Sequence, residues 1–371
     1  MSHMYKEFED EIGPEIVCHV YDPKTKMRGV AVIDNTALGP GKGGVRLVPD
    51  ITVGEVFGLA RAMTWKNALA GIPFGGAKSG IAAPGNAPNK GELVAAFAER
   101  IAPLVPSVYV PGPDMNIGEN EMAIIANTIG TPKASTGKPS SMGGLPHELG
   151  STGFGVALAT EVALAHSKVP IAGAKIAIEG FGNVGTFTMK FLTEKGAKVI
   201  AISDSKGTAY LEQGFDYNRM MQVKKEKGTV TAYPGAKALP VADLFGLKCD
   251  VLVPGARPNV ITERNGAEVK ARIVVEAANI PMTPSVELSL SKRGILVIPD
   301  FVANAGGVIS SYVEFKGGNE KEMFSLVREK ITSNTFTVLE RAVGGDTRKA
   351  ALEIARERVA DAMAKRGARK R

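Results

Sequence analysis

Residues 176–185 read Ile-Ala-Ile-Glu-Gly-Phe-Gly-Asn-Val-Gly, which places three glycines at the spacing Gly-x-Gly-x-x-Gly directly after a short apolar run. The next residues, 186–194, are compatible with a helix, so the sequence predicts a strand, a tight turn and a helix. In such a turn the glycines allow, in order, the tight bend, the approach of a pyrophosphate to the backbone, and close packing of the helix. The phosphates then lie at the helix N-terminus, which favours negative charge. We therefore predict a dinucleotide site at Gly180, Gly182, Asn183, Val184 and Gly185.

Apolar runs and helix-compatible segments alternate through the second half of the chain. From Ala174 onward, strand-like runs occur at 175–179, 198–203, 250–254, 272–276 and 295–299. This alternation is typical of a parallel sheet that is covered by helices. The sequence therefore predicts an α/β fold of the Rossmann type in this half.

The first half of the chain has a different pattern. Residues 15–50 alternate apolar runs with turn residues, which predicts two or three strands. Thr52 begins a capping-box signature, and apolar residues then recur at helical spacing up to Gly71, so a helix is expected there. Another helix is expected at 91–104, followed by a short strand and a proline-rich turn that carries Asp114.

Length, charge and cysteine content limit the possible classes of protein. The chain has 371 residues, more than one hydrophobic core usually supports, which favours two domains. Its formal net charge is +7, but residues 348–371 hold nine basic and three acidic side chains, so we expect a solvated basic C-terminal helix and no nucleic-acid partner. The two cysteines, Cys18 and Cys249, lack metal-ligand spacing, so neither a metal site nor a disulfide framework is expected. No apolar run reaches membrane-spanning length and no signal-peptide pattern opens the chain, which favours a cytoplasmic protein without membrane contact.

Three lysines stand in distinctive surroundings. Lys42 lies in Gly-Pro-Gly-Lys-Gly-Gly-Val-Arg, Lys66 in Met-Thr-Trp-Lys-Asn-Ala and Lys78 in Gly-Gly-Ala-Lys-Ser-Gly. Glycine flanks two of them, and glycine lets the backbone approach a ligand closely. The pattern indicates an anion pocket. Together with the dinucleotide fingerprint, it predicts a dehydrogenase whose substrate carries carboxylates.

The choice between NAD and NADP depends on the end of the second Rossmann strand. Asp204 lies 22 residues after Gly182, where a carboxylate accepts hydrogen bonds from the adenine ribose and favours NAD. The flanking Ser203, Ser205 and Lys206 could instead hold a 2′-phosphate. The choice of cofactor stays open, with a slight preference for NADP.

These motifs resemble those of the glutamate/leucine/phenylalanine/valine dehydrogenase family, and within it most resemble the glutamate enzymes, along nearly the whole chain. The three lysine motifs occur in the family's order, with gaps of 24 and 12 residues between the lysines. Pro113-Asp114 resembles the family's catalytic aspartate segment, and Thr152 with the following Gly-Phe-Gly resembles its nicotinamide-facing turn. Residues 304–308, Asn-Ala-Gly-Gly-Val, resemble its late glycine signature, and Ser311 follows them.

The resemblance implies a reaction and a substrate pocket. The reaction is the reversible oxidation of L-glutamate to 2-oxoglutarate and ammonia (ammonium at neutral pH), with NAD or NADP as acceptor. Lys66 is then expected to pair with the α-carboxylate. Lys42 and Ser311 are expected to hold the distal carboxylate, with Gly43 and Val308 beside them.

The resemblance also implies the catalytic groups. Lys78 is expected to act as the general base, because neighbouring cations and the loss of water on domain closure disfavour its ammonium form and lower its pKa. Asp114 is expected to exchange protons with the amino group of the substrate. Thr152, Asn279 and Asn304 are expected on the cofactor side, with Asp204 and Ser205 at the ribose.

The family's architecture implies how the chain is divided. A substrate-binding and oligomerisation domain is expected at 1–155 and is completed by a C-terminal helix at 346–371. A Rossmann-type NAD(P)-binding domain is expected at 156–345, with the active-site cleft between the two domains. The family also implies a homo-oligomer, a hexamer, whose only other partners are small molecules.

Departures from the glutamate pattern keep other functions open. Many glutamate enzymes have Arg-x-Glu-Ala-Thr-Gly where residues 148–153 read Glu-Leu-Gly-Ser-Thr-Gly, and residues 36–40 resemble the branched-chain enzymes, which leaves leucine or valine as a substrate. Against this, Lys42 stands where those relatives have an apolar residue, and an unpaired ammonium beside an isobutyl group costs roughly several kcal/mol. A catalytically silent dinucleotide-binding sensor of 2-oxoglutarate is the third possibility.

Overall fold

The computed structural model describes residues 5–146 and 149–368. Glu148, which stands where many glutamate enzymes have the arginine, lies outside these residues. Contacts divide the chain into two units: unit 1 comprises Met1–Leu149, Val308–Met323 and Ile354–Arg371, and unit 2 comprises Gly150–Gly307 and Phe324–Glu353. Unit 1 therefore includes 308–323, a segment that the sequence prediction placed within the dinucleotide domain. This segment carries Val308 and Ser311.

Unit 1 is built on a five-stranded mixed sheet with the order β1-β2-β4-β3-β5. The strands are β1 (Ile16–Tyr21), β2 (Arg28–Asn35), β3 (Gly41–Val48), β4 (Gly75–Ala82) and β5 (Tyr109–Gly112). β4 is the central strand, antiparallel to β2 and parallel to β3. β3 also pairs in parallel with β5. The three strands of residues 15–50 confirm the sequence prediction, and the next two bring Lys78 and the segment before Asp114 beside Lys42.

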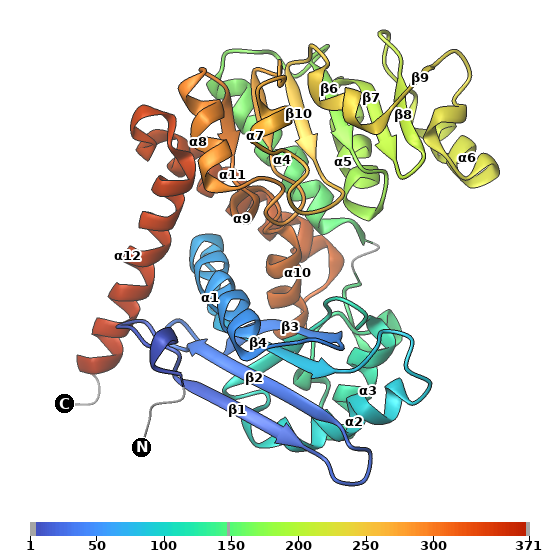
Figure 1. Ribbon diagram of the computed structural model, residues 1–371. Coiled ribbons are helices and arrows are strands. Elements are labelled where there is room, and N and C mark those ends of the chain that lie inside the picture. Colours follow the sequence, from blue (N-terminus) through green and yellow to red (C-terminus); the bar gives the residue numbers. More distant parts are fainter. Residues whose placement is uncertain (1–4, 147–148, 369–371) are drawn as a thin grey trace. The chain divides into compact units, whose positions relative to one another are not determined.

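Helices cover both faces of this sheet (Figure 1). Side chains alternate along β2, so neighbouring residues contact helices on opposite faces of the sheet. Val30 and Val32 pack with α1 (Val53–Ala70), while Ala31 and Ile33 pack with α2 (Lys90–Ile101) and α3 (Glu119–Ile129). Burial of both faces explains why β2 and β4 are almost continuously buried. The sheet is therefore the core of unit 1.

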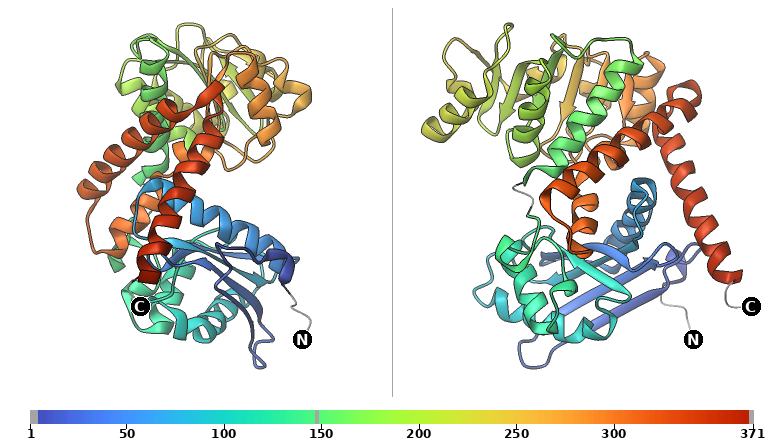
Figure 2. Two further views of the ribbon diagram at one scale, coloured as in Figure 1. Left: turned by 90° about the vertical axis from the view of Figure 1, so that its left-hand side faces the viewer. Right: turned by 180° about the vertical axis from the view of Figure 1, so that it is seen from behind.

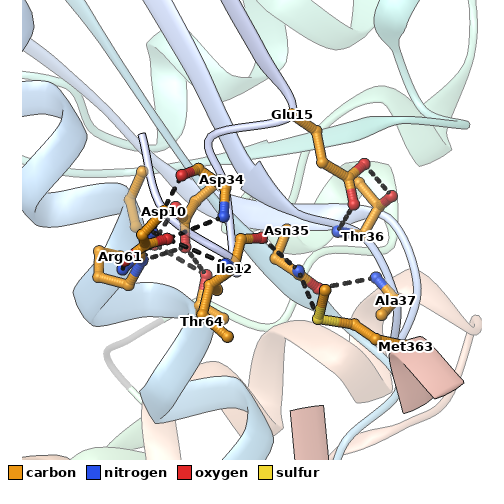
Figure 3. Close-up of polar contacts among 12 residues, drawn as sticks. Asp10, Ile12, Glu15, Asp34, Asn35, Thr36, Ala37, Arg61, Thr64 and Met363 are labelled. Carbon is orange, nitrogen blue, oxygen red and sulfur yellow. Dashed lines mark hydrogen bonds and ion pairs between the residues drawn. The ribbon is translucent and has the colours of Figure 1, made fainter. Parts of the chain in front are cut away.

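Capping and buried charge fix α1 on this sheet. Thr52 accepts a hydrogen bond from the backbone N–H of Glu55, and Gly71 ends the helix with a φ of 64° in the left-handed region, so the predicted helix is confirmed. Figure 3 shows Arg61 and Thr64 of α1 pointing at the buried carboxylate of Asp34 on β2. Arg61 Nε lies 2.9 Å from Asp34 Oδ2, and Thr64 Oγ1 donates to the same oxygen at 2.5 Å. These contacts hold the helix that carries Lys66.

The end of the chain also belongs to unit 1. It forms the last part of α12 (Thr347–Ala368), where Arg358 donates to the carbonyl oxygens of Ala68 and Leu69 at the end of α1. Nearby, Asn35 of β2 contacts Met363, as Figure 3 shows. As far as residue 368, the basic terminal segment is thus a helix, as the sequence predicted.

Unit 2 contains a seven-stranded sheet with the order β12-β11-β10-β6-β7-β8-β9. The strands are β6 (Lys175–Glu179), β7 (Lys198–Asp204), β8 (Gly207–Tyr210), β9 (Lys237–Leu239), β10 (Val251–Pro254), β11 (Ile273–Val275) and β12 (Leu296–Ile298). Five of these are parallel and confirm the predicted Rossmann-type sheet. β8 and β9 add an antiparallel edge that the sequence did not predict.

Helices flank this sheet on both faces (Figure 2). They are α4 (Ser151–His166), α5 (Asn183–Glu194), α6 (Tyr217–Lys227), α7 (Glu263–Gly266), α8 (Pro284–Lys292) and α9 (Asp300–Ala303). α10 (Gly306–Phe315) and α11 (Glu320–Arg341) follow in the chain. Short 3-10 helices lie at Lys6–Phe8, Ala102–Leu104, Pro132–Ala134, Ser140–Met142, Val230–Ala232, Val241–Gly246 and Val343–Gly345. Within residues 5–146 and 149–368, no helix has the length and apolar character needed to span a membrane.

Candidate active site

Lys78 and Asp114 form an ion pair in unit 1. Lys78 Nζ lies 2.7 Å from Asp114 Oδ2, and Arg46 Nε lies 2.9 Å from the same oxygen. Arg46 is held in turn by Glu55 of α1 at 2.6 Å. The Lys78 side chain is only 8% exposed, so the pair has little contact with water. The two residues that were predicted to be catalytic therefore touch.

Burial and charge act in opposite directions on this pair. Burial lowers the pKa of the Lys78 ammonium below its usual value, and the attraction of Asp114 opposes this shift. Burial would raise the pKa of the Asp114 carboxyl, but Lys78 and Arg46 together outweigh it and lower that pKa. The sequence prediction attributed the shift of the Lys78 pKa to neighbouring cations and to the loss of water. In the structure the larger cause is burial, and the group in direct contact is an anion.

Lys42 is a buried cation near this pair. It is the second residue of β3 and is 3% exposed, and burial lowers its pKa to about 7. Glu314 opposes this shift, whereas Lys78 and Lys138 add to it. The Lys42 ammonium lies over Gly112 of β5: a Cβ atom added to Gly112 would be only 2.3 Å from Lys42 Nζ. In the described residues no carboxylate forms an ion pair with Lys42, so a buried ammonium is available to an anionic ligand.

Thr136 contributes a buried hydroxyl beside Lys42. The same Cβ position at Gly112 would lie 3.6 Å from Thr136 Oγ1. Thr136 is fully buried, and its hydroxyl has no hydrogen-bond partner within the described part of the chain. A buried polar group without a partner is costly and is usually explained by a ligand or water. An ammonium and a hydroxyl therefore lie close to one point over Gly112, and both are groups that can donate to a carboxylate.

The other predicted substrate residues lie on elements around these groups. Lys66 is half-buried on α1. This helix covers the sheet face to which Gly76 belongs, since a Cβ atom at Gly76 would lie 2.0 Å from Thr64 of α1. Because side chains alternate along strands, Lys42 and Lys78 point to this same face. Val308 and Ser311 lie on α10, which Phe74 contacts through Tyr312 and Phe315 with ring centroids 5.8 and 5.3 Å apart.

The glycines around the lysines have a different role from the one predicted. Both Lys42 and Lys78 lie within strands rather than in ligand-binding turns. A Cβ at Gly43 would lie 1.6 Å from the carbonyl oxygen of Ala77, so this glycine allows β3 to approach β4. A Cβ at Gly44 would lie 2.7 Å from the Cβ of Asp114 and 3.3 Å from Lys78 Nζ. The glycines therefore make room for neighbouring strands and for the ion pair.

Unit 2 contains a pocket of about 600 Å³ at the Gly-x-Gly-x-x-Gly turn between β6 and α5. Gly180 has a φ of +98°, and a Cβ at Gly185 would lie 1.9 Å from the Gly180 carbonyl oxygen, so these glycines allow the bend and the close packing of α5. A Cβ at Gly182 would meet nothing within 4 Å, which leaves its backbone open to a ligand. The pocket is lined by Glu179, Gly180, Phe181, Gly182, Asn183, Val184, Gly185, Ser203, Asp204, Ser205, Val241, Gly255, Ala256 and Arg257. Its glycine-lined wall and its position at the N-terminus of α5 fit a dinucleotide pyrophosphate.

Asp204 lines this pocket, but its carboxylate already accepts four hydrogen bonds from the protein. One oxygen accepts from the Lys206 N–H at 2.8 Å and from Thr229 at 3.3 Å. The other accepts from Lys224 Nζ at 2.6 Å and from the Val230 N–H at 2.8 Å. These partners fill the capacity of a carboxylate and neutralise its charge. The predicted role of Asp204 as the ribose acceptor stays a prediction that this geometry does not favour.

Thr152, Asn279 and Asn304 lie elsewhere in unit 2. Asn304 Nδ2 donates to Asn279 Oδ1 at 3.0 Å and to the Ala277 carbonyl at 3.2 Å, so these two asparagines are neighbours. Thr152 is in the first turn of α4, and a Cβ at Gly307 would lie 3.0 Å from its hydroxyl oxygen. None of the three lines the pocket at the fingerprint turn.

Sequence reasoning gave no role to several polar groups of these sites. Arg46 was quoted only as the end of a motif, and its contact with Asp114 could have been suspected from that position. Thr136, Lys138, Glu314 and Arg257 carried no recognisable signal, because their relevance comes from contacts between distant segments. Among the described residues, no group of three or more His, Cys, Asp or Glu side chains is placed to hold a metal ion.

Two family profiles match the chain. The profile described as "Glutamate/Leucine/Phenylalanine/Valine dehydrogenase" matches residues 143–367. The profile described as "Glu/Leu/Phe/Val dehydrogenase, dimerisation domain" matches residues 14–131.

Similar proteins cover most of the chain. The glutamate dehydrogenase of Aeropyrum pernix is 39% identical over 355 residues, which is 90% of this chain and 85% of the relative. The NADP-specific glutamate dehydrogenase of Saccharolobus shibatae is 39% identical over 357 residues, which is 90% of this chain and 84% of the relative. Among solved structures, the leucine-bound form of the hetero-hexameric glutamate dehydrogenase from Thermus thermophilus has a TM-score of 0.81 and 31% identity, and covers 95% of this chain and 88% of that chain.

Proposed function

The chain belongs to the glutamate/leucine/phenylalanine/valine dehydrogenase family, and we propose that it catalyses the reversible NAD(P)-dependent oxidative deamination of L-glutamate to 2-oxoglutarate and ammonia. The observation that carries the choice of glutamate is the buried ammonium of Lys42 beside the Thr136 hydroxyl, which has no hydrogen-bond partner among the residues that the structure describes. A branched apolar side chain would leave both groups without a partner, whereas a distal carboxylate satisfies both.

Lys42, Thr136 and Ser311 would hold the distal carboxylate, and Lys66 would pair with the α-carboxylate. Gly43 and Val308 would border the substrate side chain. Two carboxylates held by separate cations fix the orientation of Cα, and such alignment accounts for much of the rate in reactions of this kind.

Lys78 and Asp114 would move the protons. Asp114, ionised between Lys78 and Arg46, would accept a proton from the substrate ammonium. Lys78, with its lowered pKa, would take a proton from the water that attacks the iminium carbon. Because the two groups are 2.7 Å apart, a proton can pass between them before ammonia leaves.

The dinucleotide would bind in the pocket of unit 2. The backbone at Gly180, Gly182, Asn183, Val184 and Gly185 would hold the pyrophosphate, with Ser205 and Asp204 towards the ribose. Thr152, Asn279 and Asn304 would border the nicotinamide part. When bound, NAD(P)⁺ supplies the redox chemistry by accepting a hydride from Cα of the substrate.

Product analysis tests this function. Purified protein incubated with L-glutamate and NAD⁺ or NADP⁺ should form reduced cofactor, ammonium and 2-oxoglutarate in equal amounts, each measured independently. Reduced cofactor formed with L-leucine or L-valine, but not with L-glutamate, would support the branched-chain alternative. A protein that binds the dinucleotide but turns over none of the three would support the sensor.

The binding of dicarboxylates should depend on pH. The folded-state pKa of Lys42 is lowered to about 7, and only the charged form pairs with a carboxylate. Full affinity is therefore expected below pH 7, and binding above pH 7 must take up a proton, so affinity falls by up to about tenfold per pH unit. Calorimetry of 2-oxoglutarate binding at pH 8, in two buffers of different ionisation enthalpy, should show proton uptake. Uptake of no proton would contradict the assignment of Lys42.

Lys224 should favour NADP over NAD. The Lys224 ammonium neutralises the Asp204 carboxylate at the end of β7. Without Lys224, the negative charge of Asp204 would repel the 2′-phosphate of NADP. Lys224→Met should therefore raise the KM for NADP(H) by about tenfold more than the KM for NAD(H), since about 1.4 kcal/mol of repulsion corresponds to that factor. Lys225→Met on the exposed side of α6 is the matched control. Equal effects on both cofactors would exclude this role for Lys224.

We also propose a homo-oligomer, a hexamer, in the cytoplasm. The structural relative from Thermus thermophilus is described as hetero-hexameric, and the profile for residues 14–131 is described as a dimerisation domain. Size-exclusion chromatography with light scattering measures the number of subunits.

A further inference from the structure

Lys138 and Glu314 form a buried ion pair in unit 1 that the mechanism does not use. Lys138 Nζ lies 2.5 Å from Glu314 Oε1, and the two side chains are 3% and 1% exposed. Glu314 Oε2 accepts hydrogen bonds from the backbone N–H groups of Gly137 and Leu145, each at 2.9 Å. The carboxylate therefore anchors both ends of the 137–145 loop to α10.

The pair is connected through its loop and through α10 to the groups assigned to the distal carboxylate. Glu314 is three residues after Ser311 and six after Val308, so the three lie on one side of α10. Gly137, which donates to Glu314, is the neighbour of Thr136. Thr136 in turn lies beside the Lys42 ammonium over Gly112. Glu314 is thus on the same helix as Ser311 and holds the neighbour of Thr136.

The pair also acts on the charge of Lys42. The charged groups that act on Lys42 are Glu314 from α10, Lys78 from β4 and Lys138 from the loop, and Lys66 of α1 is a further cation on the same face of the sheet. Glu314 is the acidic one, and its effect on the pKa of Lys42 is larger than that of either cation. An apolar side chain of equal volume at position 314 would leave the backbone N–H groups of Gly137 and Leu145 without this acceptor. The carboxylate therefore both holds the loop and acts on the charge of Lys42.

We propose that Glu314 is a positioning residue for substrates with a distal carboxylate: it orders the Thr136 loop and keeps Lys42 in its charged form, while Lys138 fixes the orientation of the Glu314 carboxylate. The proposal rests on the function proposed above and names a determinant of its substrate specificity. It predicts that Glu314 and Lys138, although paired, have opposite effects on the site.

The test compares Glu314→Gln and Lys138→Met by the pH dependence of the KM for 2-oxoglutarate. Without Glu314 the cations repel the Lys42 ammonium, so the pH midpoint above which KM rises should fall by about one unit, and KM at pH 8 should rise about tenfold. Without Lys138 the midpoint should move to higher pH, and KM at pH 8 should fall. A purely structural pair would weaken binding in both variants with an unchanged midpoint, and that result would overturn the proposal.

A matched substrate separates the charge effect from general damage. The keto acid 2-oxopentanoate has the same five-carbon chain without the distal carboxylate, and its reductive amination should show no shift of the pH midpoint in either variant. An equal shift with 2-oxopentanoate would overturn the proposal, because Lys42 would then not be the group that titrates.

A double variant keeps the test valid if a single variant does not fold. Glu314→Gln/Lys138→Met replaces two charges with neutral groups of similar volume, and its midpoint should lie below the wild-type value, since the effect of Glu314 is the larger one. A wild-type midpoint in the double variant would contradict the proposal. Absence of wild-type turnover would contradict the proposed function instead, and calorimetric binding of glutarate, which needs no turnover, would still test the role of Glu314.

Discussion

Replacing Lys78 with alanine is expected to lower kcat for oxidative deamination of L-glutamate by about 10²- to 10⁴-fold, the usual range for loss of a general base. The residue is buried, its pKa is lowered, and its ammonium touches Asp114 at 2.7 Å. No other group of the described site combines a lowered pKa with contact to the proposed proton acceptor. Without Lys78, Asp114 keeps its bond to Arg46, so the loop should stay in place.

Two controls distinguish loss of chemistry from loss of structure. The variant should bind the dinucleotide with unchanged affinity in calorimetry, because that pocket lies in unit 2. Lys90→Ala, which removes another ion-paired lysine of unit 1, should keep normal turnover. A small primary amine added to the alanine variant should restore part of the activity. Wild-type rates in Lys78→Ala would remove the proposed base.

Replacing Lys42 with leucine is expected to reverse the substrate preference. Loss of a buried cation that binds a carboxylate costs about 3–5 kcal/mol, so kcat/KM for glutamate should fall by about 10²- to 10⁴-fold. The apolar side chain also removes an unpaired ammonium from the path of an alkyl substrate, so kcat/KM for L-leucine or L-norvaline should rise about tenfold.

The matched control for this substitution is Lys133→Leu, an exposed lysine of the same unit. It should leave the ranking of substrates unchanged. If Lys42→Leu also left glutamate as the preferred substrate, the side chain of Lys42 would not face the distal carboxylate, and the assignment of Thr136 and Ser311 would lose its support.

The sequence was sufficient to predict those helices and turns whose ends are set by residues close to one another in the chain. The capping residue Thr52 and the C-terminal Gly71 mark the ends of α1 because caps are short-range interactions. The fingerprint glycines predicted the β6–α5 turn for the same reason. β8 and β9 could not be predicted, since they are short strands whose existence depends on pairing with the edge of a sheet.

Long-range contacts explain what sequence reasoning missed in the active site. Lys138 and Glu314 are 176 positions apart, and no periodicity connects them. Lys78 lies on β4, between β2 and β3, and the glycines before it are required by close neighbours: a Cβ at Gly75 would lie 1.9 Å from the Asn35 carbonyl oxygen of β2, and a Cβ at Gly76 would lie 2.0 Å from Thr64 Oγ1 of α1. The role of each glycine therefore depends on the segment that packs against it, and the amino-acid composition does not reveal that segment.

The most direct test of the dicarboxylate site is reductive amination with ammonium, using NADH or NADPH and either 2-oxoglutarate or 4-methyl-2-oxopentanoate in all four combinations. Lys42 and Thr136 predict a kcat/KM for 2-oxoglutarate that exceeds that for the branched keto acid by about 10²-fold or more with either cofactor. A preference for 4-methyl-2-oxopentanoate would contradict the account, because the buried ammonium would then have to bind something other than the substrate.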